Sequence, residues 1–345
     1  MIKVGVNRPI VFDKQLRYNR QKYYNIFEYE TIPYRDKQVY KNFNFSIFID
    51  DYCNADCKFC VAQLRYEHRH LIYKKEKLDY DDYMRQLEIV LKEIRPLNPS
   101  ISITGGEPTM SPKLLDVLKM VDKYNYRKRC ITTNGSHLLD VVNGKTILEH
   151  LIKYNWAHLN ISRVSEDEDI NKKVMRYNSE EGYCSNEMLK DILSISNKTN
   201  LAHRISCLLI KNVVDSVDKI KNYIDFYSQI GANNFIFRQL MNYSKDAINK
   251  EKIDYCDKHN VELNEIWESM NNEFEPYLNI LGYYYYVEIY KYRGLTVASE
   301  SADLNQQYKE FAKKPNVIYE MVYHPNGNLC GSWVDKDKIL IAYKN

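Results

Sequence analysis

The chain has 345 residues, of which 44% are hydrophobic and 28% charged, as in an ordinary globular protein with a sizeable buried core. Its 49 basic and 46 acidic residues nearly balance, which argues against a nucleic-acid or membrane-surface binder. No apolar run approaches the roughly 18 residues of a membrane span, and the first residues lack the apolar block of a signal peptide. We therefore expect a cytoplasmic protein whose closely spaced cysteines are ligands or catalysts rather than disulfides.

In chain order, residues 1–44 show no clear periodicity and are predicted to be an N-terminal extension. Six segments are then typical of strands: 45–50, 101–104, 130–134, 157–162, 203–210 and 234–240. Helices are predicted at 80–94, 111–124, 145–155, 165–177 and 215–231. Such alternation implies parallel strands with right-handed crossovers. Six units are too few for a closed eight-fold barrel, so we predict an α/β fold, a partial (β/α)6 TIM-like barrel over 45–240.

Two of the predicted helices carry start signals. Ser111 is followed by a proline, and Ser165 with Glu168 forms a possible capping box. After residue 240 the pattern changes to one or two helices (about 245–275) and then to strand-like segments. Asn326-Gly327 is a strong hairpin turn signal. We therefore predict that residues 241–345 form a small α+β appendage, with helices and a β-hairpin, that covers the barrel.

Three of the eight cysteines, Cys53, Cys57 and Cys60, directly follow the first predicted strand. Three thiolates in a C-x3-C-x2-C pattern can bind three irons of a cubane iron–sulfur cluster and leave the fourth iron open for another ligand. The alternatives are coincidence and a zinc site completed by His68 or His70. Structural zinc sites usually combine two pairs of ligands, so the spacing favours the cluster.

A second motif, Gly105-Gly106-Glu107-Pro108, follows the second predicted strand. In a parallel barrel both loops open on the face that carries the chemistry. The cysteine triplet, this segment and the sequence TTNG at 132–135 together resemble the radical S-adenosylmethionine (SAM) superfamily over roughly residues 45–240. Within it, the barrel segment is most similar to the branch that contains the GTP cyclase of molybdenum-cofactor synthesis and the SPASM-type enzymes. The C-terminal cysteines that hold auxiliary clusters in that branch are missing.

The resemblance implies a radical SAM enzyme with a single [4Fe–4S] cluster on the three cysteines and SAM chelated to the fourth iron. An electron, delivered by a reducing partner such as flavodoxin or ferredoxin, splits SAM, and the 5′-deoxyadenosyl radical abstracts a substrate hydrogen. Phe59 matches the aromatic position near the adenine. Gly105, Gly106 and Glu107, with Pro108, match the segment that receives the SAM ammonium group. Ser162 matches the usual contact to the ribose hydroxyls.

Further candidates follow from position. Asn134 lies on the loop after the third strand, and Arg163, after the fourth, is a candidate partner of the SAM carboxylate. Arg204 and Arg238 lie within predicted strands, where an inward-facing arginine binds an anion and an outward one caps a helix. Cys184, in a predicted loop, is a possible catalytic donor of a hydrogen atom to a product radical.

The substrate is left open between two enzyme hypotheses. The first is a small metabolite or a nucleotide-derived molecule, whose phosphate or carboxylate the arginines would bind. The second is a ribosomal peptide or protein side chain, which could add a strand to the edge of the C-terminal hairpin. A third hypothesis, from another class, is a zinc or redox-sensing module without enzymatic activity; it predicts bound zinc and no SAM cleavage.

Overall fold

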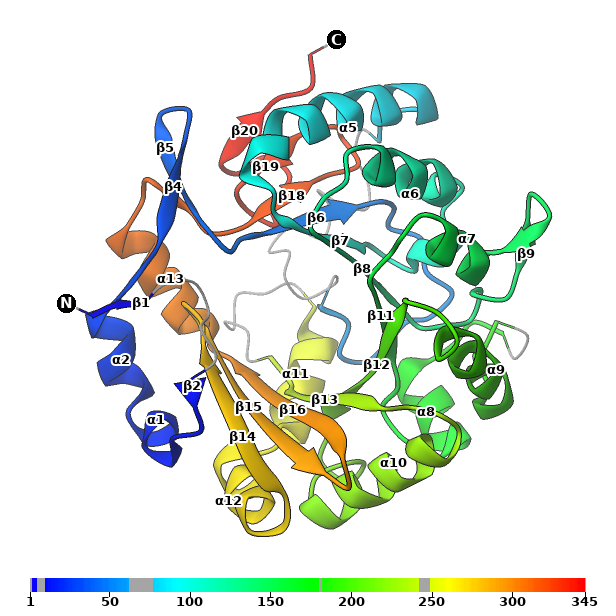
Figure 1. Cartoon of the computed structure of the whole chain (residues 1–345), viewed down its shortest axis with the longest axis vertical. Coiled ribbons are helices and arrows are strands. Elements are labelled where there is room, and N and C mark those ends of the chain that lie inside the picture. Colours follow the sequence, from blue (N-terminus) through cyan, green and yellow to red (C-terminus); the bar gives the residue numbers. More distant parts are fainter. Residues whose placement is uncertain (1, 5–9, 62–76, 180–181, 242–248, 345) are drawn as a thin grey trace.

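The computed structural model describes residues 2–4, 10–61, 77–179, 182–241 and 249–344. Its centre is a curved sheet in which six parallel strands lie side by side in sequence order (Figure 1). They are β6 (Asn44–Phe48), β7 (Ser100–Thr104), β8 (Lys128–Thr133), β11 (His158–Ser162), β12 (Ala202–Leu209) and β13 (Asn234–Gln239). The edge strands of the described sheet are β2 and β20, so the barrel stays open. This confirms the predicted partial barrel.

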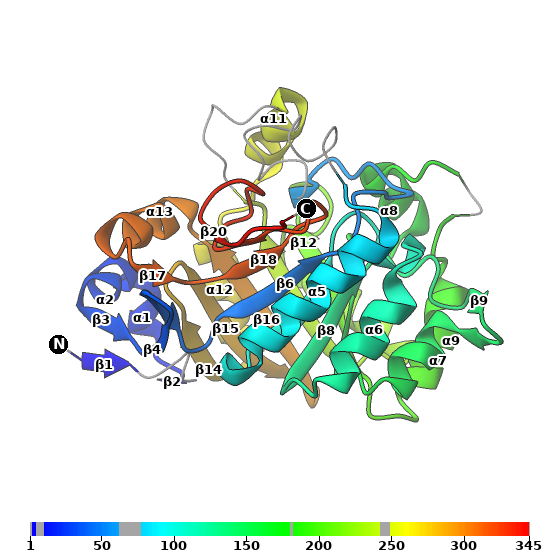
Figure 2. The same ribbon diagram turned by 90° about the horizontal axis from the view of Figure 1, so that it is seen from above.

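Helices cover the outer face of these strands (Figures 1 and 2). They are α5 (Tyr80–Ile94), α6 (Leu114–Lys123), α7 (Ile147–Lys153), α8 (Glu168–Met175), α9 (Asn186–Ser196) and α10 (Val217–Gln229). In α5, Leu87, Val90, Leu91 and Ile94 are fully buried against the sheet, as their helical spacing requires. Five of these helices contribute an apolar stripe to one continuous core, whereas α8 packs Val174 and Met175 in a separate cluster with Ile210 and Leu240.

Three local predictions are corrected by this description. Helix α9, capped by the Ser185 side chain, was not among the predicted helices. The expected capping box at Ser165 does not form, because Asp167 is the N-cap of α8 and accepts a hydrogen bond from the Ile170 amide (3.0 Å). Helix α6 begins at Leu114 rather than at Ser111, because a short 3-10 turn (Pro108–Met110) precedes it.

The C-terminal residues add strands to both edges of the same sheet, so they are not a separate appendage laid over it. Strands β14 (Glu275–Leu281), β15 (Tyr285–Tyr292) and β16 (Leu295–Ala302) follow β13, which pairs in parallel with β16. Strands β18 (Met321–Tyr323), β19 (Leu329–Cys330) and β20 (Ile339–Ile341) extend the other edge from β6. Helices α11 (Lys250–His259), α12 (Leu263–Glu273) and α13 (Leu304–Lys313) accompany them. The predicted turn at Asn326-Gly327 does join antiparallel strands, β18 and β19.

The N-terminal residues also belong to this assembly. Strand β2 (Ile10–Val11) pairs with β14, and α1 (Lys14–Tyr18) and α2 (Arg20–Ile26) lie beside the β14–β15 region (Figure 1). The remaining short strands are β1 (Ile2–Val4), β3 (Phe27–Tyr29), β4 (Thr31–Tyr34), β5 (Lys37–Tyr40), β9 (Val141–Val142), β10 (Lys145–Thr146) and β17 (Val317–Ile318). Among the described helices, none has the length and apolar character needed to cross a bilayer.

Candidate functional site

The cysteine cavity lies at the C-terminal ends of the parallel strands and has a volume of about 280 Å³. All three cysteines of the triplet line it, on the loop after β6. Six other residues predicted from the sequence also line it: Phe59, Gly105, Gly106, Glu107, Asn134 and Ser162. Arg238 contributes a cationic side chain, and Val164, Met175 and Leu208 contribute apolar ones. The structure thus brings residues from the ends of six strands, β6, β7, β8, β11, β12 and β13, to one cavity.

Gly105 and Gly106 allow the cysteine loop to pack directly on the backbone after β7. The Gly106 amide donates to the Asp50 carbonyl oxygen (2.8 Å), and the Glu107 amide donates to the Tyr52 carbonyl oxygen (2.7 Å). A Cβ atom on Gly105 would lie 2.2 Å from the Asp50 oxygen, and one on Gly106 would lie 2.1 Å from the Tyr52 oxygen. Any larger residue would therefore displace the loop that carries the cysteines.

The Glu107 carboxylate is buried and is held entirely by neutral donors. Its Oε1 accepts from the Thr109 amide (3.0 Å), the Thr109 hydroxyl (2.6 Å) and the Thr133 hydroxyl (2.6 Å), and its Oε2 accepts from the Asn134 amide (2.7 Å). In the part of the chain that the structure describes, no lysine, arginine or histidine pairs with it. The wall of the cavity therefore carries a negative charge without a counter-charge, which suits a cationic ligand.

Asn134 braces the cysteine loop. Its side-chain amide donates to the Asn54 Oδ1 (2.8 Å), and its Oδ1 accepts from the Ser136 amide (3.0 Å) and hydroxyl (2.7 Å). Asn54 in turn donates to the Ser136 hydroxyl (3.0 Å). These contacts connect the loop after β8 to the residue that follows Cys53.

Lys252 and Arg176 clamp the same loop from outside, and sequence reasoning missed both. The Lys252 ammonium, on α11, donates to Asp56 Oδ1 (2.6 Å) and to the Cys57 carbonyl oxygen (2.5 Å). Arg176, at the end of α8, donates to the Asp56 carbonyl oxygen (2.8 Å) and pairs with its carboxylate (2.8 Å). No local signal in the sequence connects Lys252 to Cys57, 195 residues away.

The thiols of the triplet suit metal binding through the thiolate. Burial raises the pKa of Cys53 to about 12 and raises the pKa of Cys57 well above its usual range. Binding of a metal by the Cys53 and Cys57 thiolates would therefore release protons. Three thiols in one cavity, with an open wall of Gly105 and Gly106 beside them, fit the donor set that a [4Fe–4S] cluster requires.

The zinc alternative gains no support from the described residues, which contain no group of three Cys, His, Asp or Glu side chains around a single ion position. A cubane cluster binds each thiolate to a different iron and does not need such a group. His68 and His70, the proposed zinc partners, lie outside the described residues.

Four sequence candidates lie away from the cavity walls. The Arg163 guanidinium is fully buried and donates to the Tyr227 hydroxyl (3.1 Å), the Cys184 carbonyl oxygen and Asn186 Oδ1. It faces α9 and α10, so this placement does not fit a contact to the SAM carboxylate. Pro108 is buried at the start of the 3-10 turn.

Cys184 is also fully buried, behind Gly135, where an added Cβ would lie 3.1 Å from its Sγ. Burial raises the pKa of this thiol to about 11. It is not on the cavity wall, so the structure does not fit its expected role as a hydrogen-atom donor.

Arg204 and Arg238 both face the inside of the barrel, at different depths. Arg204 donates twice to Asn160 Oδ1 (3.0 and 2.9 Å), and burial, with the charge of Arg238, lowers its pKa to about 10. Arg238 lines the cavity, donates to the Ser206 hydroxyl (2.8 Å) and pairs with Glu300 (3.4 Å). Of the two, Arg238 is therefore the arginine that a ligand in the cavity can reach.

This open barrel, with three cysteines and a Gly-Gly-Glu segment at one cavity, has the architecture of an iron–sulfur SAM protein. Residues 47–196 match the family model described as the radical SAM superfamily. The GTP 3′,8-cyclase of Clostridium perfringens strain 13 is 30% identical over 132 residues, 38% of this chain and 37% of the cyclase. A probable GTP 3′,8-cyclase of Thermoplasma volcanium is 25% identical over 208 residues, 60% of this chain and 56% of that protein.

Among solved structures, Streptococcus suis SuiB bound to its precursor peptide SuiA resembles the fold, with a TM-score of 0.51 and 16% identity. The alignment covers 92% of this chain and 63% of SuiB. In the comparison with the Clostridium cyclase, by contrast, the chain spans only 37% of that relative's length. Residues 47–196 therefore carry a radical SAM superfamily domain, which begins within β6.

Proposed function

We propose that this chain is a radical SAM enzyme that holds a single [4Fe–4S] cluster and starts a hydrogen abstraction on a small metabolite or a nucleotide-derived substrate. One observation carries the proposal: the three thiols and the Gly105–Glu107 segment share one cavity. When bound, the cluster would supply the electron that cleaves SAM to methionine and a 5′-deoxyadenosyl radical, the species that would abstract the substrate hydrogen.

The chain's own residues position these groups. Cys53, Cys57 and Cys60 would hold the cluster, and the uncompensated Glu107 carboxylate would favour the ammonium group of SAM in the same cavity. Phe59 and Ser162, which both line the cavity, offer an aromatic surface and a hydroxyl for the adenosine. Val164, Met175 and Leu208 make part of the cavity apolar and so exclude water from a reactive species.

Two features support the small-substrate proposal. The relatives named above are GTP 3′,8-cyclases, and by their name they act on a nucleotide. Arg238 also lines the cavity, where an arginine can bind a phosphate or carboxylate. We propose flavodoxin or ferredoxin as the class of reducing partner.

A peptide substrate is the second candidate. It is favoured by β20, which is the edge strand of the described sheet and could pair with an extended peptide. SuiB, which binds the precursor peptide SuiA, resembles this chain in fold.

The test is an anaerobic reconstitution of the full chain with iron and sulfide. We expect about four irons per chain, an EPR signal on reduction, and formation of 5′-deoxyadenosine from SAM. Cys57→Ala should lose the iron and the activity. Cys330→Ala, which changes a buried cysteine of β19, is the matched control and should keep both. Bound zinc, or SAM cleavage that survives in Cys57→Ala, would overturn the proposal; about eight irons would overturn the single cluster.

A further inference from the structure

A second cavity, which the function proposed above does not use, lies under the N-terminal helices. This N-terminal cavity has a volume of about 480 Å³, within the usual range for small-molecule sites. Polar side chains dominate its walls, chiefly Arg17, Arg20, Gln21, Gln239, Asn264 and Ser301. They come from α1, α2, α12 and the ends of β13 and β16. The site is therefore built from the two ends of the chain, outside the matched radical SAM domain.

A narrow middle cavity of about 60 Å³ lies between the N-terminal cavity and the cysteine cavity. It shares Phe59, Leu208 and Arg238 with the cysteine cavity. It shares Gln239 and Ala302 with the N-terminal cavity. The three cavities thus follow one another along the ends of β13 and β16.

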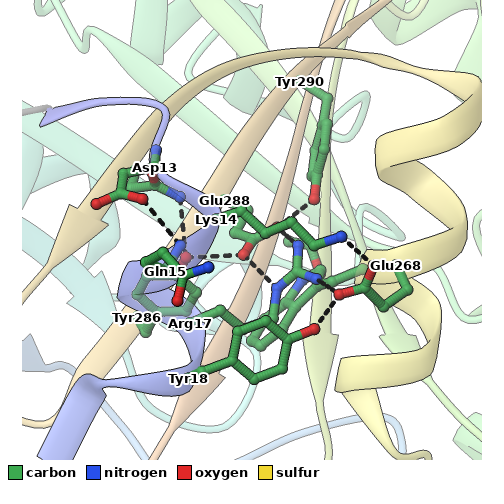
Figure 3. A network of polar contacts seen from close by, with 12 residues as sticks. Asp13, Lys14, Gln15, Arg17, Tyr18, Glu268, Tyr286, Glu288 and Tyr290 are labelled. Atoms are coloured by element: carbon green, nitrogen blue, oxygen red, sulfur yellow. Dashed lines mark hydrogen bonds and ion pairs between the residues drawn. The ribbon is translucent and has the colours of Figure 1, made fainter.

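Two arginines of the N-terminal cavity differ in what they bind. The Arg17 guanidinium is fully buried, donates twice to Glu288 (2.8 and 2.7 Å) and pairs with Glu268 (2.8 Å), as Figure 3 shows. Its charge is therefore neutralised within the fold. Arg17 fastens α1 to β15 and α12 and is not available to a ligand.

Arg20 has no such partner. Its Nε donates to the Arg17 carbonyl oxygen (3.1 Å), and its guanidinium carbon lies 5.4 Å from the Trp267 ring centre and 5.3 Å from that of Tyr286. Among the described residues, no carboxylate forms an ion pair with it, and its two terminal nitrogens donate to no side chain. Asp303, the acidic residue of this cavity, is the N-cap of α13 and accepts from the Gln306 amide (3.0 Å).

We propose that the N-terminal cavity binds the oxyanion end of the substrate, a phosphate or a carboxylate, through Arg20. An arginine whose flat face rests on aromatic rings presents its edge to a planar pair of oxygens, the geometry of bidentate recognition. The carbon skeleton of the substrate then extends past Gln239 and Ala302 toward the cysteine cavity. That the ligand is the substrate rests on the function proposed above. Binding of an anion at Arg20 can be tested without that assumption.

The test is a calorimetric titration of inorganic phosphate, and separately of acetate, into the full reconstituted chain at low ionic strength, where screening is weakest. We expect the wild-type chain to bind at least one of the two anions. Arg20→Gln should weaken that binding by about 10-fold or more, since a hydrogen bond to a charged group contributes that much. Asn264→Asp, an exposed change that places a negative charge at the cavity, should weaken binding as well. A stronger response to phosphate identifies a phosphorylated substrate, and a stronger response to acetate a carboxylic acid.

Arg35→Gln is the matched control. Arg35 also lies over an aromatic ring, that of Tyr34 (5.4 Å), but it pairs with Glu93 on the surface. Its replacement should leave anion binding unchanged. Binding of neither anion, or binding by Arg20→Gln and Asn264→Asp equal to that of the wild type, would overturn the proposal. Formation of 5′-deoxyadenosine by the same wild-type preparation tests the proposed function separately, because anion binding does not depend on SAM cleavage.

Discussion

Two buried carboxylates, Glu107 and Glu288, lie in different halves of the molecule and are satisfied in opposite ways. Glu107 accepts four hydrogen bonds from neutral amides and hydroxyls and lines the cysteine cavity. Glu288 accepts from the Arg17 guanidinium and from the hydroxyls of Tyr286 and Tyr290. The comparison teaches that a buried charge paired inside the fold makes the fold sensitive to loss of either partner. A buried charge left without a counter-charge marks a wall where a ligand of opposite charge fits.

The largest effect is expected from Gly106→Ala. This substitution disturbs the backbone that precedes Glu107 and packs against the cysteine loop. The new Cβ would lie 2.1 Å from the Tyr52 carbonyl oxygen, so the cysteine loop must move. We expect loss of iron binding on reconstitution and a fall of about 4 kcal/mol or more in the free energy of unfolding.

Gly144→Ala is the control for Gly106→Ala. Gly144 has a positive φ of 75° but no atom within 4 Å of an added Cβ. It should cost only about 1–2 kcal/mol of backbone strain and leave iron binding intact. Normal iron content in Gly106→Ala would contradict the argument from close backbone approach.

Arg17→Met tests the buried ion pair between Arg17 and Glu288. The substitution leaves Glu288 buried without its counter-charge, which typically costs about 3–5 kcal/mol. Urea unfolding of the iron-free chain measures the change. Lys14→Met removes an exposed partner of Glu268 and should cost no more than about 1 kcal/mol. Equal effects of the two substitutions would show that burial does not decide the strength of this network.

Glu107→Gln should have a smaller effect on stability, because no ion pair is broken. The new amide group turns an acceptor into a donor that faces other donors, such as the Asn134 amide or the Thr133 hydroxyl. We expect a loss of about 1–3 kcal/mol in the free energy of unfolding and weaker SAM binding, measured by equilibrium dialysis. Glu265→Gln, on the surface of α12, should change neither quantity. Unchanged SAM binding in Glu107→Gln would show that the uncompensated carboxylate does not contribute to binding of the SAM ammonium group.

Lys252→Met is expected to have the smallest effect on stability, about 1–2 kcal/mol. Methionine keeps the packing of the aliphatic stem but loses the hydrogen bonds to Asp56 and to the Cys57 carbonyl oxygen. The reconstituted variant should release iron to a chelator faster than the wild type. Lys250→Met, an exposed change on the same helix, should release iron at the wild-type rate. Equal rates for both variants would show that the clamp does not hold the cysteine loop.

The parts of the fold and site that sequence reasoning predicted are those encoded locally. The six parallel strands follow from short apolar runs, and nine wall residues follow from the short motifs and strand ends that resemble the radical SAM pattern. The sheet edges were not predictable, because parallel pairing of β18 with β6 and of β16 with β13 depends on long-range packing. Lys252 and the Arg17–Glu288 pair were missed for the same reason.

Arg163 and Cys184 were misplaced by a different limit of sequence reasoning. Both positions lie near strand or helix ends at the correct end of the barrel, so their location in the chain suggested the cavity. The Arg163 side chain turns toward α9 and α10, and the Cys184 thiol lies behind Gly135, so both pack behind the wall. A side chain's direction at the end of a strand is set by its neighbours in space, which the sequence does not order.

The pairing of Arg17 with Glu288 also constrains how the protein is made. These residues are 271 positions apart, so a ribosome needs roughly 14–54 s after completing α1 to deliver its partner. Until then the N-terminal helices have a charged group to bury and no surface on which to bury it. The cysteine half of the barrel, by contrast, has its strands β6, β7 and β8 within about 90 residues of synthesis. The nascent chain therefore has the cysteine loop and its first three strands long before Glu288, the buried partner of Arg17, has been made.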